Sequence, residues 1–182
     1  KEDEVEGMVA RALEQFGRLD VLVNNAGIFG AKPFLENTEE DIDRFIHINL
    51  KGTYFVSQAA VRQMKQQGGG SIVNIGTVLV SHPIGSIPAS AAMITKGGVH
   101  ALTTSLASEL AADNIRVNLV APGMIRTPLW GDANVDDFGG VALLNRVGEV
   151  QEITEAVFSL ATAGFTTGVI LPVDGGYVHG RA

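Results

Sequence analysis

The stretch IRVNLVAPG, residues 115–123, decides the fold. It is rich in Ile, Val and Leu and ends in Pro–Gly, which predicts a strand that stops at a turn. Before it, residues 88–112 place Val99, Leu102, Leu106 and Leu110 on one helical face. After it, EVQEITEAVFSLAT at 149–162 has a second helical pattern. A strand with a helix on each side of it in the chain indicates an alternating α/β order.

The same alternation extends to both ends of the chain. Connections as long as these favour right-handed crossovers between parallel strands, so the sequence predicts a doubly wound α/β domain over residues 1–182 with helices on both sheet faces. Further buried strands are predicted at 19–27 (LDVLVNNAG), 68–78 (GGGSIVNIGTV) and 168–176 (GVILPVDGG), and further helices at 5–16 and, with interruptions, from the N-cap signal NTEE at 37–40 through 52–67.

Composition and charge exclude several classes of protein. The 182 residues are 46% hydrophobic and 18% charged, as in one globular domain with a substantial core. A net charge of −7 with only 13 Lys and Arg provides no basic stripe for nucleic acid. The chain has no Cys, and no apolar run approaches the roughly 20 residues of a bilayer span. We expect a soluble, cytoplasmic protein with no nucleic-acid partner, no membrane partner and no metal site.

A series of short motifs runs almost from end to end of the chain. The motifs are NNAG (24–27), INLKG (48–52), SIVNIGT (71–77), TKGG (95–98), IRVNLVAPG (115–123) and PVDGG (172–176). Together, in their order and spacing, they resemble the short-chain dehydrogenase/reductase family. The resemblance implies a Rossmann-like fold and hydride transfer between a nicotinamide cofactor and a carbonyl or hydroxyl group.

The resemblance implies a binding site for NAD or NADP. It implies that small residues after the first strand let the backbone approach the cofactor, that Lys96 holds the nicotinamide ribose, and that the end of the third strand passes beneath the nicotinamide. The cofactor-binding residues that it indicates are Asn25, Ala26, Gly27, Lys96, Pro122, Gly123, Ile125 and Thr127.

The catalytic positions match the family only in part. The family has a Tyr four residues before the Lys, where this chain has Ala92. By resemblance, Asn49 bends its helix and holds a water of the proton relay, while Thr77 stands where the family has a catalytic Ser. Asn49 as a helix cap and Thr77 as an ordinary strand-end residue remain open, and so does a lone surface Lys96. The connection from Thr77 to Lys96 is about two residues longer than the family's usual spacing.

Two residues of that connection are candidate replacements for the Tyr, each with an ordinary structural alternative. His82 could donate a proton near neutral pH, although a loop His is more often a surface residue. Ser90 equally suits the start of a helix beside Pro88.

Two segments complete the expectations about organisation. The family normally begins with strands and a Gly-rich turn that this sequence does not contain, so we expect the 182 residues to be the larger part of a longer protein; the alternative is a minimal chain whose sheet edge a partner subunit covers. The irregular segment at about 124–147 follows the third strand and is a candidate substrate lid, or else an ordinary surface insertion.

The leading hypothesis is therefore an NAD(P)-dependent oxidoreductase that acts on a small carbonyl or alcohol substrate with an atypical active site. The alternative is a non-catalytic nucleotide-binding or assembly subunit with the same fold. The resemblance further implies a homo-oligomer, a tetramer or dimer, assembled through residues 52–67, residues 88–112 and the last strand.

Overall fold

The computed structural model describes residues 2–131 and 133–180. Its elements follow the predicted alternation, in the order α1 (Glu2–Phe16), β1 (Val21–Asn24), α2 (Glu39–Phe45), a π-helical segment (Ile46–Lys51), α3 (Gly52–Gln66), β2 (Gly70–Ile75), α4 (Ser90–Glu109), β3 (Ile115–Pro122), α5 (Val150–Thr162) and β4 (Ile170–Val173). Short 3₁₀ turns occupy the connections, among them Pro128–Trp130 and Val135–Val141 in the predicted lid.

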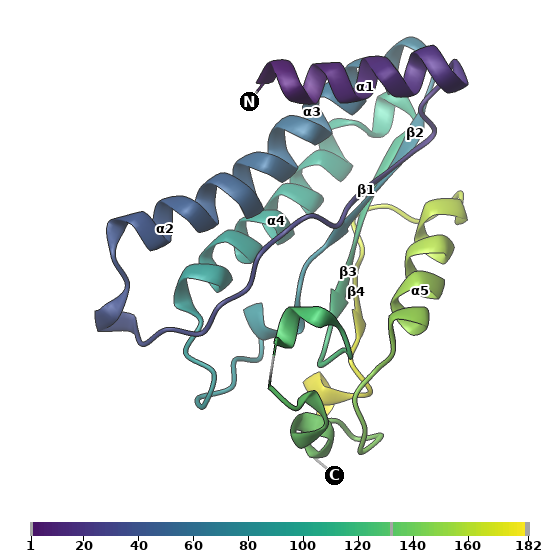
Figure 1. Cartoon of the computed structure of the whole chain (residues 1–182). Helices are drawn as coiled ribbons and strands as arrows, with labels where there is room; N and C mark the ends of the chain where they lie inside the picture. Colours follow the sequence, from purple (N-terminus) through teal and green to yellow (C-terminus); the bar gives the residue numbers. More distant parts are fainter. Residues whose placement is uncertain (1, 132, 181–182) are drawn as a thin grey trace.

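The four strands form one parallel sheet in the order β1-β2-β3-β4. Figure 1 shows α3 and α4 on one side of this sheet, α5 on the other, and α1 lying across α3. The predicted doubly wound α/β class is confirmed. Because all strands are parallel, their carboxyl ends meet at one edge of the sheet.

Two apolar layers fill the space between the sheet and its helices. On the α3 and α4 side, Met64 and Ala107 pack against Ile72 and Val117 of the central strands. On the α5 side, the layer consists of Leu160, Val73 and Val120, with partly buried neighbours around them. The central strands are therefore covered on both faces, as expected for a parallel sheet.

The first strand differs from the prediction. It is not buried: Val21 and Val23 are each 41% exposed. They pair in register with Ser71 and Val73, and Val73 faces α5, so the two valines point to the face that α5 covers over β2, β3 and β4. The apolar run predicted a fully buried strand, but β1 lies at the edge of the sheet, where only its α3 face is covered.

The predicted interruption between the second and third helical stretches is a π-helical segment. The amide of Gly52 donates to the carbonyl of His47, five residues earlier, instead of four. Thr38, which begins α2, forms a capping box with Asp41. π-helical turns frequently occur at functional sites because they reorient a side chain within a continuous helix, and here the segment contains Asn49.

Candidate functional site

A cavity of about 330 Å³ opens at the carboxyl ends of the strands. The connection after β1, the end of β2, the helix α4 and the segment after β3 all contribute to its wall. Of the residues predicted from the sequence, it brings together Asn25, Gly27, Thr77, Lys96, Pro122, Gly123, Ile125 and Thr127. Ala26 lies between two lining residues but is itself exposed, and it is not part of the wall.

Lys96 reaches into this cavity from α4. Its Nζ donates a hydrogen bond to the carbonyl oxygen of Ile75 at 2.7 Å. Burial lowers the pKa of Lys96 from 10.5 to about 8. A Cβ added to Gly27 would lie 3.4 Å from this amine, so the glycine backbone and the lysine are immediate neighbours.

Asn49 is fully buried behind the same loop. Its Oδ1 accepts from the amide of Ile28 at 2.8 Å, and its Nδ2 donates to the carbonyl of Ile28 at 3.0 Å and to Thr95 Oγ1 at 3.2 Å. The side chain thus holds the loop that follows β1 against α4. It does not line the cavity, and a Cβ at Gly27 would come within 3.1 Å of its Oδ1.

The turn after β3 requires close backbone approach. A Cβ at Gly123 would lie 2.8 Å from the Cα of Asp174, whereas the Gly123 amide donates to Val173 at 3.0 Å. Asp174 in turn caps its own turn by accepting from the amide of Gly176 at 2.9 Å. The PVDGG motif therefore fixes the position of Gly123 beside the cavity, which is a structural role.

Thr77 lies at the cavity wall where β2 ends. Its hydroxyl accepts from the amide of Leu79 at 3.2 Å and thereby caps a short 3₁₀ turn. Its own amide is 3.4 Å from Nε2 of His100, a long hydrogen bond to a ring nitrogen that must be unprotonated to accept it. Burial, and secondarily the nearby Lys96, lower the pKa of His100, which favours this neutral form.

Sequence reasoning missed His100. It lies one helical turn after Lys96 on α4, and a Cβ at Gly76 would meet its Nε2 at 2.4 Å. Only glycine at residue 76 admits this ring. The available signal was the spacing of four residues between Lys96 and His100, which puts both on one helix face.

Ala92 also lines the cavity, one turn before Lys96, and is 1% exposed. Ala92 and Lys96 therefore both belong to the cavity wall. The chain's two tyrosines, Tyr54 and Tyr177, do not line the cavity, and neither does His82, whose carbonyl accepts from the Tyr177 hydroxyl at 2.7 Å.

Ser90 is the first residue of α4, as the helix-start interpretation predicted, and is not in the cavity wall. The helix predicted at 88–112 thus begins two residues later, and α4 ends at Glu109.

A polar network within the sheet was also missed. Asn24 Nδ2 donates to Asn74 Oδ1 at 2.8 Å and to Ser57 Oγ at 2.9 Å, and Asn74 Nδ2 donates to Thr103 Oγ1 at 2.9 Å. These bonds tie β1 and β2 to α3 and α4 directly behind the cavity. An Asn inside each apolar strand was the signal, because a buried amide needs partners.

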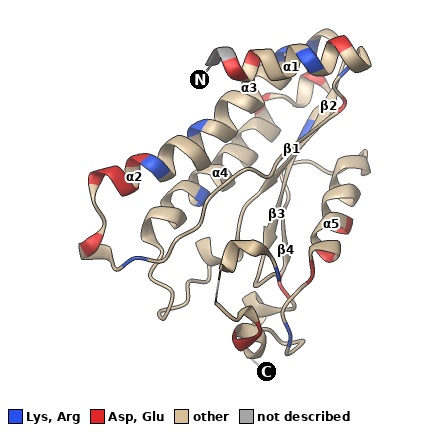
Figure 2. Ribbon diagram, in the orientation of Figure 1, with Lys and Arg blue, Asp and Glu red and all other residues tan. Residues whose placement is uncertain are grey.

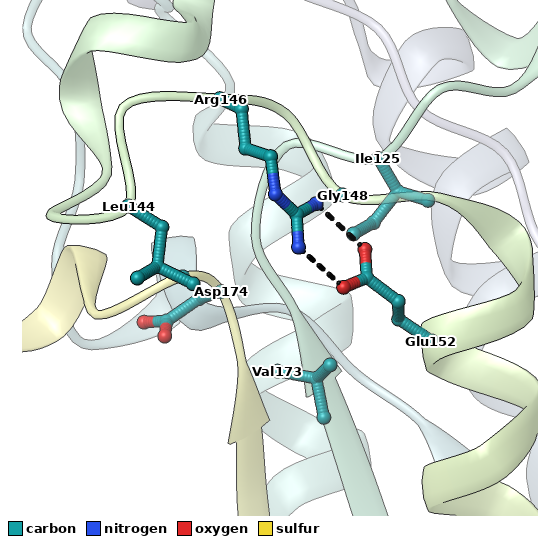
Figure 3. Close-up of a pocket in the computed structure, with 8 residues that line it drawn as sticks. Ile125, Leu144, Arg146, Gly148, Glu152, Val173 and Asp174 are labelled. Carbon is teal, nitrogen blue, oxygen red and sulfur yellow. Dashed lines mark hydrogen bonds and ion pairs between the residues drawn. The ribbon is translucent and has the colours of Figure 1, made fainter.

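Ion pairs anchor the lid-like segment. Arg126 forms a bidentate pair with Asp136 at 2.5 and 2.8 Å and also contacts Glu149 at 3.1 Å. Arg146 forms a second bidentate pair with Glu152, lowering the pKa of that carboxyl to about 2 (Figure 3). Figure 2 shows these basic and acidic segments close together near the start of α5.

The segment is also packed from within. Val135 and Val147 are buried against Met124 and Leu79. The amide of Arg126 donates to the carbonyl of Gly148 at 2.9 Å, and the amide of Gly148 donates to the carbonyl of Met124 at 2.8 Å. The predicted lid at 124–147 is thus a folded wall of the cavity in its described part; Asp132 lies outside the described residues.

Residues 2–131 and 133–180 contain neither a metal-binding cluster nor a membrane-spanning helix. Over these ranges, no three His, Asp or Glu side chains come close enough together to hold a metal ion. Nor does any helix of the described chain combine the length and apolarity that crossing a bilayer requires.

Comparison with known proteins gives a consistent result. A family model described as enoyl-(acyl carrier protein) reductase matches residues 1–178. Carbonyl reductase family member 4 of Xenopus laevis is 41% identical over 176 residues, which cover 97% of this chain and 74% of that protein. The solved short-chain type dehydrogenase/reductase from Mycobacterium marinum superposes with a TM-score of 0.90 at 34% identity, covering 98% of this chain and 72% of that one. ElxO with NADP bound gives a TM-score of 0.89 at 32% identity, with coverage of 98% and 75%.

Proposed function

The chain belongs to the short-chain dehydrogenase/reductase family, and on that premise we propose that it is an NAD(P)-dependent oxidoreductase that interconverts carbonyl and hydroxyl groups. The observation that carries the proposal is the convergence of Gly27, Lys96 and Gly123 on one cavity at the carboxyl ends of the strands. Ligands of open α/β sheets bind at this edge.

The shape and chemistry of the cavity fit a nicotinamide cofactor. At Gly27 and Gly123 the wall is bare backbone, and added Cβ atoms would meet neighbouring atoms at 3.1 and 2.8 Å. Lys96 supplies a cationic donor, and Thr127 a hydroxyl. We assign Asn25, Gly27 and Lys96 to the ribose, and Pro122, Gly123, Ile125 and Thr127 to the nicotinamide and its carboxamide. ElxO, a relative by structure, binds NADP.

When bound, the cofactor would supply or accept the hydride, and the chain's own residues would orient and polarise the substrate. The Thr77 hydroxyl is placed to donate a hydrogen bond to the substrate oxygen, because its present bond to the Leu79 amide uses it only as an acceptor. Lys96 would hold the ribose, and its buried positive charge would favour negative charge developing on that oxygen.

The proton step lacks the family's phenol. Ala92 offers no donor, so the proton must come through Thr77, water or another neighbouring group. The side chain of Asn49 is hydrogen-bonded to the backbone of Ile28 and to the hydroxyl of Thr95, and it holds the surrounding loop in place. We propose that orientation of the hydride donor and acceptor supplies most of the rate, which is a contribution separate from acid catalysis, while the proton reaches the substrate oxygen through Thr77, water or a neighbouring group.

The test separates this function from that of a non-catalytic nucleotide-binding or assembly subunit. Titration with NADH and NADPH, followed by the fluorescence of the reduced cofactor, measures binding; oxidation over a panel of ketones and aldehydes then measures turnover. Lys96→Met should weaken cofactor binding by about tenfold or more, whereas Lys51→Met, outside the cavity, should not. Cofactor binding without turnover on any carbonyl would favour the alternative.

A further inference from the structure

One lobe of the cavity wall is aromatic. Phe29 and Trp130 line it, with ring centroids 6.4 Å apart, and Phe138 stacks on the far side of Trp130 at 5.3 Å with an interplanar angle of 29°. The indole Nε1 donates to the carbonyl of Ile125 at 2.8 Å. Because that nitrogen is the only donor of the indole, the ring offers the cavity a carbon surface held in a fixed orientation.

The remaining wall of this lobe is aliphatic. Leu79, Met93 and Met124 line it, and the same side chains belong to the apolar cluster that includes buried Val135 and Val147. Since these walls are part of a packed core, their shape exists before a ligand binds.

The lobe also continues toward Ala92, which lines the cavity beside Met93 and Lys96. A methyl group there leaves more room for a ligand than a larger side chain would. Together with the aromatic and aliphatic wall, this small residue favours a bulky apolar group such as a ring.

The cavity offers almost nothing to an anion. Among the described lining residues, Lys96 is the only charged side chain, and its amine donates to Ile75 at 2.7 Å. Arg126 and Arg146, which are adjacent in sequence to parts of this wall or its apolar cluster, are bound to Asp136, Glu149 and Glu152. A substrate carboxylate in the aromatic lobe would lose its hydration without gaining a partner.

We propose that this lobe makes the enzyme selective for neutral, ring-bearing hydrophobic ketones and alcohols, and that it discriminates against substrates carrying a carboxylate on the ring. The inference rests on the proposed function for the identity of the reacting group, but the selectivity is a binding property that can be measured without turnover.

The experiment uses a pair of ketones that differ in charge and little else, methyl 4-oxocyclohexanecarboxylate and 4-oxocyclohexanecarboxylate. Trp130 is the chain's single tryptophan, so quenching of its emission in the presence of NADP⁺ reports ligand binding in this lobe. We expect the ester to bind at least about tenfold more tightly than the acid, the same order as the cost of leaving a charge unpaired.

Leu129 offers a gain-of-function test, because it lines the cavity yet is 60% exposed and tolerates a polar replacement. Leu129→Arg places a cation in the wall, so the ratio of ester affinity to acid affinity should fall by about tenfold. Leu129→Gln, of similar length but neutral, should leave the ratio unchanged.

The outcomes separate this inference from the proposed function. Equal or tighter binding of the acid by the wild-type protein overturns the selectivity, as does the absence of quenching by either ketone up to its solubility limit. Selective quenching with no oxidation of NADH or NADPH supports the selectivity but counts against the proposed enzyme.

Discussion

At the scale of single residues, the methyl group of Ala92 and the amine of Lys96 define what this cavity can do. Both line it from one face of α4, four residues apart. Because Ala92 lines the cavity, we expect a larger side chain at residue 92 to extend into it.

Ala92→Tyr should therefore create or raise activity. A phenol at this position would lie one turn from Lys96 and could exchange a proton with the substrate oxygen, which is worth about 10²- to 10⁴-fold in rate. The measurement is kcat for NADPH-dependent ketone reduction. Ala92→Phe fills the same volume without a hydroxyl and should give no increase; an equal gain in both variants would mean that the effect is packing and not proton transfer.

Lys96 has a second, pH-dependent effect that concerns stability. Its pKa falls from 10.5 to about 8 in the folded chain because of burial. Between these pH values Lys96 is protonated in the unfolded chain but not in the folded one. The free energy of unfolding should therefore rise as pH increases from about 8 to 10.5. Below pH 8 the burial penalty is complete, on the order of 3 kcal/mol.

Lys96→Met should consequently stabilise the protein at pH 7 while impairing cofactor binding. We expect a gain of about 1–2 kcal/mol, less than the full penalty because the Ile75 carbonyl loses its hydrogen bond. Urea unfolding at pH 7 and at pH 9.5 tests both the stabilisation and its pH dependence. The free energy of unfolding should rise between these two pH values in the wild type and in Lys51→Met, but not in Lys96→Met. A destabilised Lys96→Met protein at pH 7 would contradict the assignment.

At the scale of elements, Arg116 of β3 terminates α5. Its guanidinium donates to the carbonyls of Leu160 at 2.9 Å, Ala161 at 2.6 Å and Thr166 at 3.1 Å. The first two belong to the last turn of α5, where carbonyls lack partners within the helix and the helix dipole is negative. One side chain thus joins strand, helix and following loop.

Arg116→Met keeps most of the aliphatic stem but removes all three donors. The free energy of unfolding should fall by about 2 kcal/mol, since hydrogen bonds from a charged donor are lost and partly buried carbonyls remain. Chemical denaturation measures the change. Arg11→Met on the exposed face of α1 serves as the control, and a loss in Arg116→Met no larger than in this control would argue against the capping role.

Most elements were predictable from the sequence because local signals agree with the fold. Apolar runs ended by Gly or Asn gave β2 and β3, and helical periodicity gave α1 and α5. The exposure of β1 was not predictable, since an edge strand and a central strand of a parallel sheet share one composition. Local patterns could flag Asn24, Asn74 and His100 as residues that need partners, but not which partners they meet, because the Asn24–Asn74 bond and the approach of His100 to Gly76 join residues far apart in the sequence.

The candidate site was likewise predictable only in part. The motifs pointed to the segments that meet at the cavity, and eight of the site residues predicted from them line its wall. They did not identify Phe29 or Trp130, because an isolated aromatic residue in an irregular segment has no periodicity that predicts which way it faces. The orientation of Trp130 depends on its bond to the carbonyl of Ile125 and on its ring contacts with Phe29 and Phe138.

At the scale of the whole molecule, several large apolar side chains are exposed on the surface instead of packed in the core. On α3, Tyr54 and Phe55 are 48% and 38% exposed and meet edge to face at 5.5 Å. We propose that this face takes part in a homo-oligomer, a dimer or tetramer, together with α4 and β4 as expected from the sequence.

Charging that face should dissociate the assembly. We expect Tyr54→Glu with Phe55→Glu to lower the molar mass measured by light scattering, because the two carboxylates would be buried without partners. The same two charges on α5, by Gln151→Glu and Thr154→Glu, should leave the mass unchanged. A wild-type protein that is monomeric at all concentrations would rule out the oligomer directly.

The π-helical segment at Ile46–Lys51 carries a further consequence for how this protein can be altered. It amounts to one surplus residue in an otherwise regular helix, so deleting a residue there would restore ordinary bonding and strengthen the helix, yet would rotate Asn49 away from the Ile28 loop by about 100°. The three hydrogen bonds of buried Asn49 would then be lost, so the gain in helix bonding would come at the expense of the loop beside the cavity.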